Sequence, residues 1–249
     1  MHGLFSSGPQ HRSDAIPNST GSHALEARGL VLAYGSLPVV RDVDISVDPG
    51  EIVVLVGANG AGKSTTLLGL AGGLPPVSGE VLLNGQPAQG ALSQRSRDGF
   101  AYITEERCVL MTMTVEENLK LGAGGVDRAV DFMPELKPLL NRRVGLLSGG
   151  EQQMVALARA LATNPSVIAA DELSLGLAPL IVDRLMKVLR DAADHGVAVL
   201  IVEQQVRRAL HLCDRGYVMR QGQVVIEGTR DELLARIDDV EHAYLSAAS

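Results

Sequence analysis

The sequence lacks any apolar run long enough to cross a bilayer. A spanning helix needs about 20 apolar residues, whereas the longest run here, around Val197 to Val202, has the length of a strand. The first residues, MHGLFSSGPQHRSD, also lack the basic start and apolar stretch of a signal peptide. We therefore expect a soluble, cytoplasmic protein that reaches a membrane only through a partner.

A basic excess and a set of paired cysteines are missing as well. The net charge is −7, which argues against a nucleic-acid binder but leaves room for a nucleotide site that needs one or two local cations. The two cysteines, Cys108 and Cys213, form no CxxC pair and indicate isolated thiols in a reducing compartment. With 46 % hydrophobic and 20 % charged residues among 249, the chain can bury a core of one large or two small domains.

Apolar strands alternate with helical patterns along most of the chain. Residues 1–23 are rich in Ser, Gly, Pro and His without periodicity, which predicts a disordered tail before one domain over 24–249. Short apolar strands such as EIVVLVG, PSVIAADE and VAVLIVE are separated by helical patterns, which indicates an α/β fold with a parallel sheet. Asn84-Gly85 signals a hairpin in an antiparallel N-terminal part. From about 106 to 147 the pattern turns helical.

One segment has the composition of a phosphate-binding loop. GANGAGKS fits G-x-x-x-x-G-K-[ST], with an apolar strand before it and a helical pattern after it. Backbone N–H groups of such a loop cradle phosphate oxygens at a helix N-terminus. Only four of the 22 cationic residues are lysines, yet a lysine stands here, where a compact ammonium is required. The expected nucleotide-binding residues are Gly57, Ala58, Asn59, Gly60, Ala61, Gly62, Lys63, Ser64 and Thr65.

Two carboxylates follow a second apolar strand, in VIAADE. A phosphate loop needs a carboxylate for Mg²⁺ and a group that orients the attacking water. We expect Asp171 to hold Mg²⁺ together with the Ser64 hydroxyl, and Glu172 to polarise the water. Lys63 would reach the β- and γ-phosphates and join Glu172 in catalysis.

The three segments GANGAGKS, LSGGEQQM and VIAADE, in this order, resemble the ATP-binding cassette (ABC) family, the motor ATPases of ABC transporters. The resemblance covers roughly residues 24–246 and implies a P-loop fold with a RecA-like core, an antiparallel β part and a helical subdomain. It also implies that Ser148, Gly149, Gly150 and Glu151 contact the γ-phosphate of ATP held by a second cassette in a head-to-tail dimer. Tyr34, in LAYG, matches the aromatic residue that stacks on adenine.

Several positions depart from the usual pattern of the family. Gln204 stands where most members have a histidine that touches the γ-phosphate, and Glu105 stands where a glutamine is usual. Leu173 replaces the proline after Glu172, which leaves that turn less rigid, and Ala178 replaces an aspartate. Glu105, SLGLAP and Glu-Gln at 203–204 resemble the ATPases of branched-chain amino-acid importers and their urea and amide relatives. Because Gln204 can donate a hydrogen bond but cannot titrate, catalysis would rest on Glu172, Lys63 and Mg²⁺.

Two functions remain open at this point. In the first, the chain hydrolyses ATP for an importer and works with membrane permease subunits, a second ABC ATPase and, indirectly, an external solute-binding protein. In the second, it is a regulatory cassette that binds ATP and hydrolyses it weakly, as the substitutions Gln204, Leu173 and Ala178 allow. Soluble ABC proteins of DNA repair or translation usually carry two cassettes or long inserts, which this chain does not show. Homodimer and heterodimer both fit the sequence.

Overall fold

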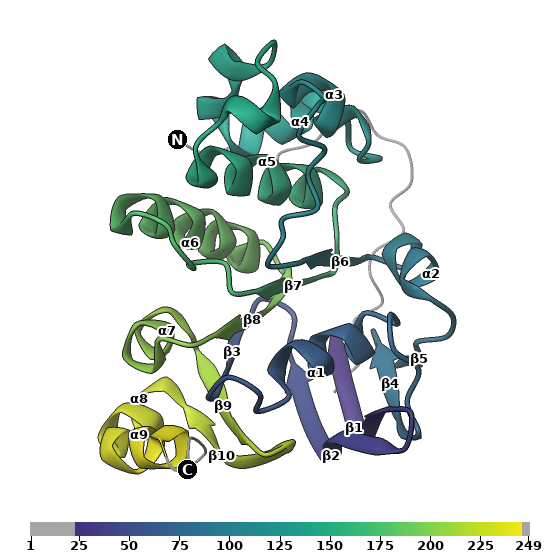
Figure 1. Ribbon diagram of the computed structural model, residues 1–249, viewed down its shortest axis with the longest axis vertical. Helices are drawn as coiled ribbons and strands as arrows, with labels where there is room; N and C mark the ends of the chain where they lie inside the picture. Colours follow the sequence, from purple (N-terminus) through teal and green to yellow (C-terminus); the bar gives the residue numbers. More distant parts are fainter. Residues whose placement is uncertain (1–22, 246–249) are drawn as a thin grey trace.

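The computed structural model describes residues 23–245, which form two β-sheets and a set of covering helices (Figure 1). The tail predicted for residues 1–23 lies outside the described residues except for His23, whose Nδ1 is 2.5 Å from Oδ1 of Asp48. Within residues 23–245, no helix combines the length and the apolar character that a membrane span requires.

The N-terminal sheet is antiparallel, with strand order β2-β1-β4-β5. Its strands are β1 (Leu25–Tyr34), β2 (Leu37–Val47), β4 (Ser78–Leu83) and β5 (Gln86–Pro87). The predicted hairpin turn joins β4 to β5, and both Asn84 and Gly85 take positive φ values of 49° and 74°. Two consecutive residues with positive φ are what a two-residue hairpin of matching twist requires.

The second sheet has six strands in the order β10-β9-β3-β8-β7-β6. It contains β3 (Ile52–Val56), β6 (Phe100–Ile103), β7 (Val167–Asp171), β8 (Ala198–Glu203), β9 (Arg215–Arg220) and β10 (Gln223–Thr229). All neighbours pair in parallel except β9 and β10, which form an antiparallel hairpin. This parallel core with an antiparallel sheet and a helical part is the predicted fold class.

Both faces of the six-stranded sheet are covered, so its central strands β3, β7 and β8 are apolar except for the last residue of β7, Asp171, and of β8, Glu203. Alternate residues enter different cores: Val54 packs with the helices, whereas Val53 and Leu55 face the antiparallel sheet. Helix α1 (Lys63–Leu70) lies between the two sheets, and α5 (Gly149–Ala162) and α6 (Pro179–Asp194) lie on the opposite face (Figure 1).

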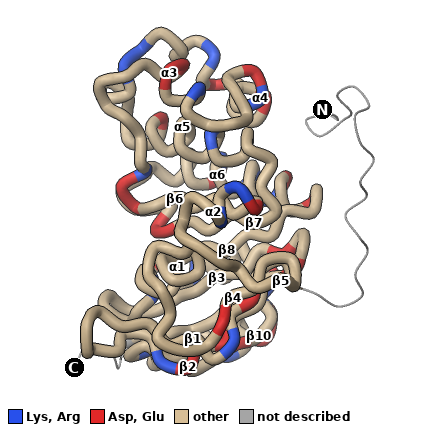
Figure 2. The backbone as a smooth tube through the Cα atoms, turned by 90° about the vertical axis from the view of Figure 1, so that its right-hand side faces the viewer, with Lys and Arg blue, Asp and Glu red and all other residues tan. Residues whose placement is uncertain are grey.

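The remaining helices lie around these layers, and most are short. They are α2 (Leu92–Arg97), α3 (Val115–Lys120), α4 (Gly125–Phe132), α7 (Val206–Leu212), α8 (Arg230–Ala235) and α9 (Ile237–Leu245), with 3₁₀ turns at Pro134–Leu139 and Val144–Leu146. Helices α3 and α4 pack on α5 and form the helical end of the molecule. In Figure 2, acidic and basic residues both occur at this end and along the strands. No continuous basic stripe crosses the side of the described chain that this view shows.

Capping boxes begin three of the helices: a Ser or Thr side chain accepts the backbone N–H three residues on, where a glutamate follows. Thr114 and Glu117 exchange these bonds at α3, Ser148 and Glu151 at α5, and Thr229 and Glu232 at α8. In each case the glutamate carboxylate accepts the N–H of the cap residue, at 2.7–2.8 Å.

Candidate nucleotide-binding site

The loop between β3 and α1 has the backbone of a phosphate cradle. Gly60 and Gly62 take φ values of 79° and 104°, which L-residues with a side chain rarely adopt. At Gly57 a Cβ atom would lie 2.4 Å from the carbonyl oxygen of Met219, so the loop can pass this close to β9 only as glycine. The chain therefore turns tightly from the centre of the sheet into the N-terminus of α1.

Lys63 is the first residue of α1 and points back into this loop. Its side chain is buried, and Nζ donates hydrogen bonds to the carbonyl oxygens of Gly57 at 2.8 Å and Ala58 at 3.1 Å. Burial lowers the pKa of Lys63, and the nearby charges of Glu172 and Asp171 oppose that shift. The ammonium thus lies beneath the loop, where a bound phosphate would meet it.

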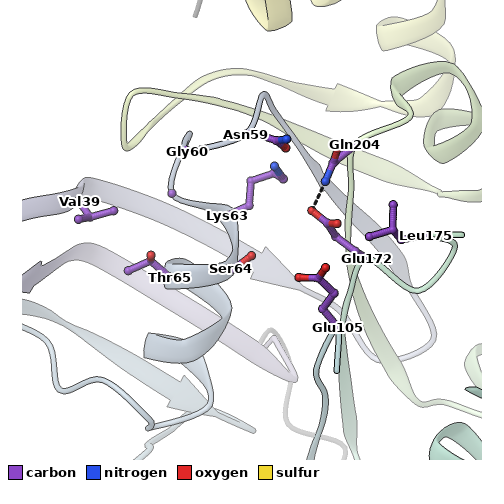
Figure 3. Close-up of a pocket in the computed structure, with 11 residues that line it drawn as sticks. Val39, Asn59, Gly60, Lys63, Ser64, Thr65, Glu105, Glu172, Leu175 and Gln204 are labelled. Atoms are coloured by element: carbon purple, nitrogen blue, oxygen red, sulfur yellow. Dashed lines mark hydrogen bonds between the residues drawn. The ribbon is translucent and has the colours of Figure 1, made fainter. Parts of the chain in front are cut away.

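A cavity of about 550 Å³ opens beside the loop and is lined by nine of the eighteen predicted site residues (Figure 3). Its polar walls come from four separate segments: the phosphate loop with the start of α1, the loop after β6, the end of β7 and the end of β8. The lining residues are Val39, Asn59, Gly60, Gly62, Lys63, Ser64, Thr65, Glu105, Glu172, Leu175 and Gln204. This volume is in the range of small-molecule sites.

Asp171 ends β7, is not among the residues that line this cavity, and has an unused acceptor. Its side chain is buried, and Oδ1 has no hydrogen-bond partner within the described residues. Burial raises the pKa of Asp171, although a hydrogen bond from Ser64 acts in the opposite direction. An orphaned buried carboxylate oxygen next to a serine hydroxyl fits a Mg²⁺ ion, which takes oxygen ligands and usually completes its shell with water and phosphate.

Glu172 follows directly and reaches the cavity from a strained backbone position. Its φ is 49°, and its N–H donates to the carbonyl oxygen of Val202 on β8 at 3.0 Å. The side-chain amide of Gln204 donates a hydrogen bond to Oε1 of Glu172, as the dashed line in Figure 3 shows. Gln204 therefore contacts the expected base, and its contact with the γ-phosphate stays a prediction, because the amide has a second N–H donor.

The segment Ser148–Glu151 does not line this cavity. It forms the capped N-terminus of α5, with Ser148 exposed. A Cβ at Gly150 would lie 2.9 Å from Ile181, so this glycine allows α5 to pack on α6. At Gly149 a Cβ would meet Arg107 at 3.5 Å and Leu177 at 3.7 Å, which are ordinary van der Waals contacts. A single chain thus presents the signature and the phosphate loop at separate places.

Three further predicted residues differ in their relation to the cavity. Tyr34 ends β1 with 53 % of its surface exposed and is not a lining residue, and Ala58 and Ala61 are buried within the loop. Val39, on β2, and Leu175, in the loop after β7, line the cavity but were not predicted as site residues. Val39 lies in a segment without a motif, whereas Leu175 lies in SLGLAP, which was considered for its family resemblance and not for a contact with this cavity.

Comparison with known proteins decides the family. The sequence model described as ABC transporter matches residues 40–174, more than half of the chain. The chain belongs to the ABC transporter family. As a member it is an ATP-binding subunit with ATPase activity, and subunits of this kind dimerise and work with membrane permeases.

Curated relatives match this cassette over most of its length. The high-affinity branched-chain amino acid transport ATP-binding protein BraG of Pseudomonas aeruginosa is 40 % identical, covering 85 % of this chain and 95 % of the relative. The probable branched-chain amino acid transport ATP-binding protein LivF of Archaeoglobus fulgidus is also 40 % identical, with 81 % and 90 % covered. The lipopolysaccharide export system ATP-binding protein LptB of Escherichia coli K12 is 34 % identical, with 89 % and 96 % covered.

Solved structures share the fold of this cassette. A nucleotide-free ATP-binding cassette from an ABC transporter superposes with a TM-score of 0.80 at 26 % identity, covering 88 % of this chain and 96 % of the other. The ADP conformation of another such cassette gives 0.78 at 25 % identity, with 89 % and 99 % covered. These matches confirm the predicted cassette fold.

Proposed function

We propose that this chain hydrolyses Mg-ATP as the ATP-binding subunit of an importer for branched-chain amino acids or related small polar solutes. The observation that carries the proposed ATPase site is that Lys63 and Glu172 line one cavity, with the buried carboxylate of Asp171 directly before Glu172 at the end of β7. The importer class rests on the 40 % identity to BraG and LivF over most of the chain.

In this proposal the loop N–H groups and Lys63 hold the phosphates of ATP at the N-terminus of α1. Ser64 and Asp171 hold Mg²⁺, which offsets negative charge on the phosphate oxygens. Glu172 accepts a proton from the attacking water, and Gln204 orients the Glu172 carboxylate through its hydrogen bond. Glu105 approaches the same cavity from the loop after β6.

The rest of the proposed nucleotide site lies in two other places. Tyr34 stacks on adenine at the rim of the antiparallel sheet. Ser148, Gly149, Gly150 and Glu151 of a second cassette close over the γ-phosphate, which accounts for their distance from the cavity in one chain. Whether the second cassette is a copy of this chain or a related subunit is an outcome of the dimer experiment below.

The proposed assembly is peripheral on the cytoplasmic side of the membrane. Two permease subunits dock on the helical region, about residues 106–147, and an external solute-binding protein delivers the solute to them. The acidic charge of the chain gives no support for nucleic acid as a partner.

A regulatory cassette with weak hydrolysis is the second candidate. One observation favours it: the Gln204 amide already occupies Oε1 of Glu172, and a hydrogen bond to a carboxylate lowers its strength as a base. An export function is a third possibility, since LptB is 34 % identical.

Turnover and trapping separate the first two candidates. The test is phosphate release by the complex with its permeases, for the wild type, Glu172→Gln and, as control, Glu227→Gln on exposed β10. We expect Glu172→Gln to bind ATP, to lose turnover and to accumulate an ATP-bound dimer in size-exclusion chromatography. Mass analysis of that dimer distinguishes a homodimer from a heterodimer. A wild-type complex without turnover would favour the regulatory candidate.

Uptake of labelled leucine, isoleucine and valine tests the transport class. Cells lacking the gene should lose high-affinity uptake, and the wild type but not Glu172→Gln should restore it. Unchanged uptake with retained ATPase activity would reject these solutes while leaving the ATPase subunit intact.

A further inference from the structure

Glu203, the last residue of β8, is a buried carboxylate that the ATPase chemistry described above does not use. It is 6 % exposed and does not line the nucleotide cavity. Both of its oxygens accept hydrogen bonds from Ser174: Oε1 accepts the N–H at 3.0 Å, and Oε2 accepts the hydroxyl at 2.8 Å. Ser174 is itself buried and lies two residues after Glu172.

We propose that Glu203 is a positioning residue that holds Glu172 in its catalytic orientation by fixing Ser174. The proposal deepens the proposed function and rests on it, because it takes Glu172 as the base of the ATPase. It concerns the backbone of the turn that carries Glu172, and not the carboxylate of Glu172 itself.

The first argument is the geometry of that turn. The N–H of Leu175 donates to the carbonyl oxygen of Glu172 at 3.1 Å, which closes a four-residue turn with Leu173 and Ser174 at its centre. Proline is favoured at the first central position of such turns because its ring fixes φ. Leu173 occupies that position and leaves φ free, so the turn needs another constraint.

The second argument is strain at Glu172. A residue with a side chain at a φ of 49° is uncommon, and it persists only where its surroundings determine the backbone on both sides. On the N-terminal side, the N–H of Glu172 is bonded to Val202 of β8. On the C-terminal side, Leu173 is 1 % exposed and packs in the core between the six-stranded sheet and the helices α5 and α6, and Ser174 is hydrogen-bonded to Glu203. The two ends are thus tied to adjacent residues of one strand.

The third argument is the cost of placing a carboxylate there. A buried carboxylate is unfavourable unless its oxygens are hydrogen-bonded. Burial raises the pKa of Glu203, and the two bonds from Ser174 oppose that shift. The Ser174 backbone and hydroxyl offer two donors, and a carboxylate offers two acceptors at matching positions. Because its two oxygens match the two donors of Ser174, Glu203 can fix the turn at residues 172–175. This explains why a carboxylate stands at the end of an otherwise apolar strand.

The experiment compares four variants in the complex with its permeases: Glu203→Ala, Ser174→Ala, Ser174→Thr and Glu232→Ala. We expect Glu203→Ala to lower kcat about tenfold to a hundredfold, since it removes both bonds to a charged acceptor. The KM for ATP and the Kd of a non-hydrolysable Mg-ATP analogue should stay within about twofold of wild type, because the phosphate loop is untouched. Ser174→Ala removes only the hydroxyl and should give an intermediate kcat. Ser174→Thr keeps the hydroxyl and should restore a kcat near wild type.

Glu232→Ala is the matched control for stability. The Glu232 carboxylate also accepts one backbone N–H and one hydroxyl, both from Thr229, but at the start of α8 away from the cavity. Its loss should change Tm without changing kcat. An equal loss of kcat in Glu232→Ala and Glu203→Ala would show a general stability effect and overturn the proposal.

A double mutant decides whether Glu203 acts through Glu172. In the Glu172→Gln background, Glu203→Ala should cause no further loss of the residual rate, because residues that act as one unit are not additive. A full additional loss, or a folded Glu203→Ala protein with wild-type kcat, would reject the role of Glu203. If Glu203→Ala does not fold, Ser174→Ala and Ser174→Thr carry the test, and equal kcat values for the two would reject it. A wild-type complex without turnover would instead reject the proposed function, and this inference with it.

Discussion

Gln204 and Glu172 are joined by a hydrogen bond between the amide of one side chain and Oε1 of the other. They stand at the ends of β8 and β7, which are adjacent parallel strands, so the backbone ladder brings them together. Gln204 donates this bond at any pH near neutrality, because an amide does not titrate. A histidine at the same position would change its charge near pH 6.5.

Replacing Gln204 should therefore change both the rate and its pH dependence. Gln204→Ala removes one hydrogen bond to a charged group, worth about 1.5–3 kcal/mol, and should slow turnover by about tenfold to a hundredfold. Gln204→His should retain activity but lose rate as the pH falls through the pKa of the new histidine, since an imidazolium beside Glu172 weakens it as a base.

The measurement for Gln204 is the ATPase rate of the complex between about pH 6 and 8. The control is Gln223→Ala at the exposed start of β10. An alanine variant as fast as wild type at every pH would show that the amide has no catalytic part.

Lys63 should be irreplaceable even by arginine. Its ammonium fits beneath the loop and bonds the carbonyls of Gly57 and Ala58, and a planar guanidinium cannot occupy that space without displacing the loop. Both Lys63→Ala and Lys63→Arg should lose binding of a non-hydrolysable Mg-ATP analogue by more than about a hundredfold in calorimetric titration, since two favourable contacts are lost. Lys187→Arg, on α6 outside the cavity, is the control. Unchanged affinity of Lys63→Ala would contradict the assignment of the loop.

The two thiols should react at very different rates. Cys108 is exposed, whereas Cys213 is buried, and burial raises the pKa of the Cys213 thiol to about 12. Because only the thiolate reacts with alkylating reagents, iodoacetamide at pH 8 should modify one thiol in the folded protein and both in urea. Peptide mass spectrometry should locate the fast site at Cys108, and Cys108→Ser should abolish it. Rapid labelling of Cys213 in the folded state would contradict its burial.

Acid should weaken the protein partly through its capping boxes. Hydrogen bonds from Thr114 lower the pKa of Glu117 below its usual value near 4.5. A carboxylate with a depressed folded-state pKa stabilises the fold above its unfolded pKa, and that stabilisation is lost as the pH falls through the folded pKa. In urea unfolding, Glu117→Gln should have a flatter decline of the unfolding free energy below about pH 4.5 than wild type. Glu227→Gln, which caps no helix, should keep the wild-type slope, and identical slopes for all three proteins would exclude this contribution.

Local patterns were the predictable part of this molecule. The phosphate loop consists of eight adjacent residues, and its backbone requires positive φ at Gly60 and Gly62. Each capping box spans four adjacent residues. The apolar strands β3, β7 and β8 were predictable because burial on both faces removes polar residues from them. Because parallel strands end on the same side of a sheet, the phosphate loop after β3 and the Asp171–Glu172 pair after β7 could be expected on one side.

Contacts between distant segments were not predictable in the same way. Strand β6 has four residues, too few for a periodic signal, and it was not expected as a strand. Leu173 predicted a less rigid turn, but the structure buries that side chain and ties Ser174 to Glu203, which is 29 residues away in sequence. Ser174 and Glu203 meet because β8 lies beside β7 in the sheet. The alternation of strands and helices along the sequence does not predict that order of strands.

The pairing of β3, β8 and β7 sets the spacing of the nucleotide site in units of the backbone ladder. Val56 lies opposite Glu203, and Val202 lies opposite Asp171. The distance between the phosphate loop and Glu172 is therefore set by the backbone pairing of three strands, β3, β8 and β7. The side chains that follow these strands decide only the chemistry of the site. Residues at the ends of these strands can therefore be substituted in the course of evolution without changing the distance between the phosphate loop and the base. A single-residue insertion within one of these strands, by contrast, would displace an entire end by about one 3.3 Å step and could not be repaired by any substitution nearby.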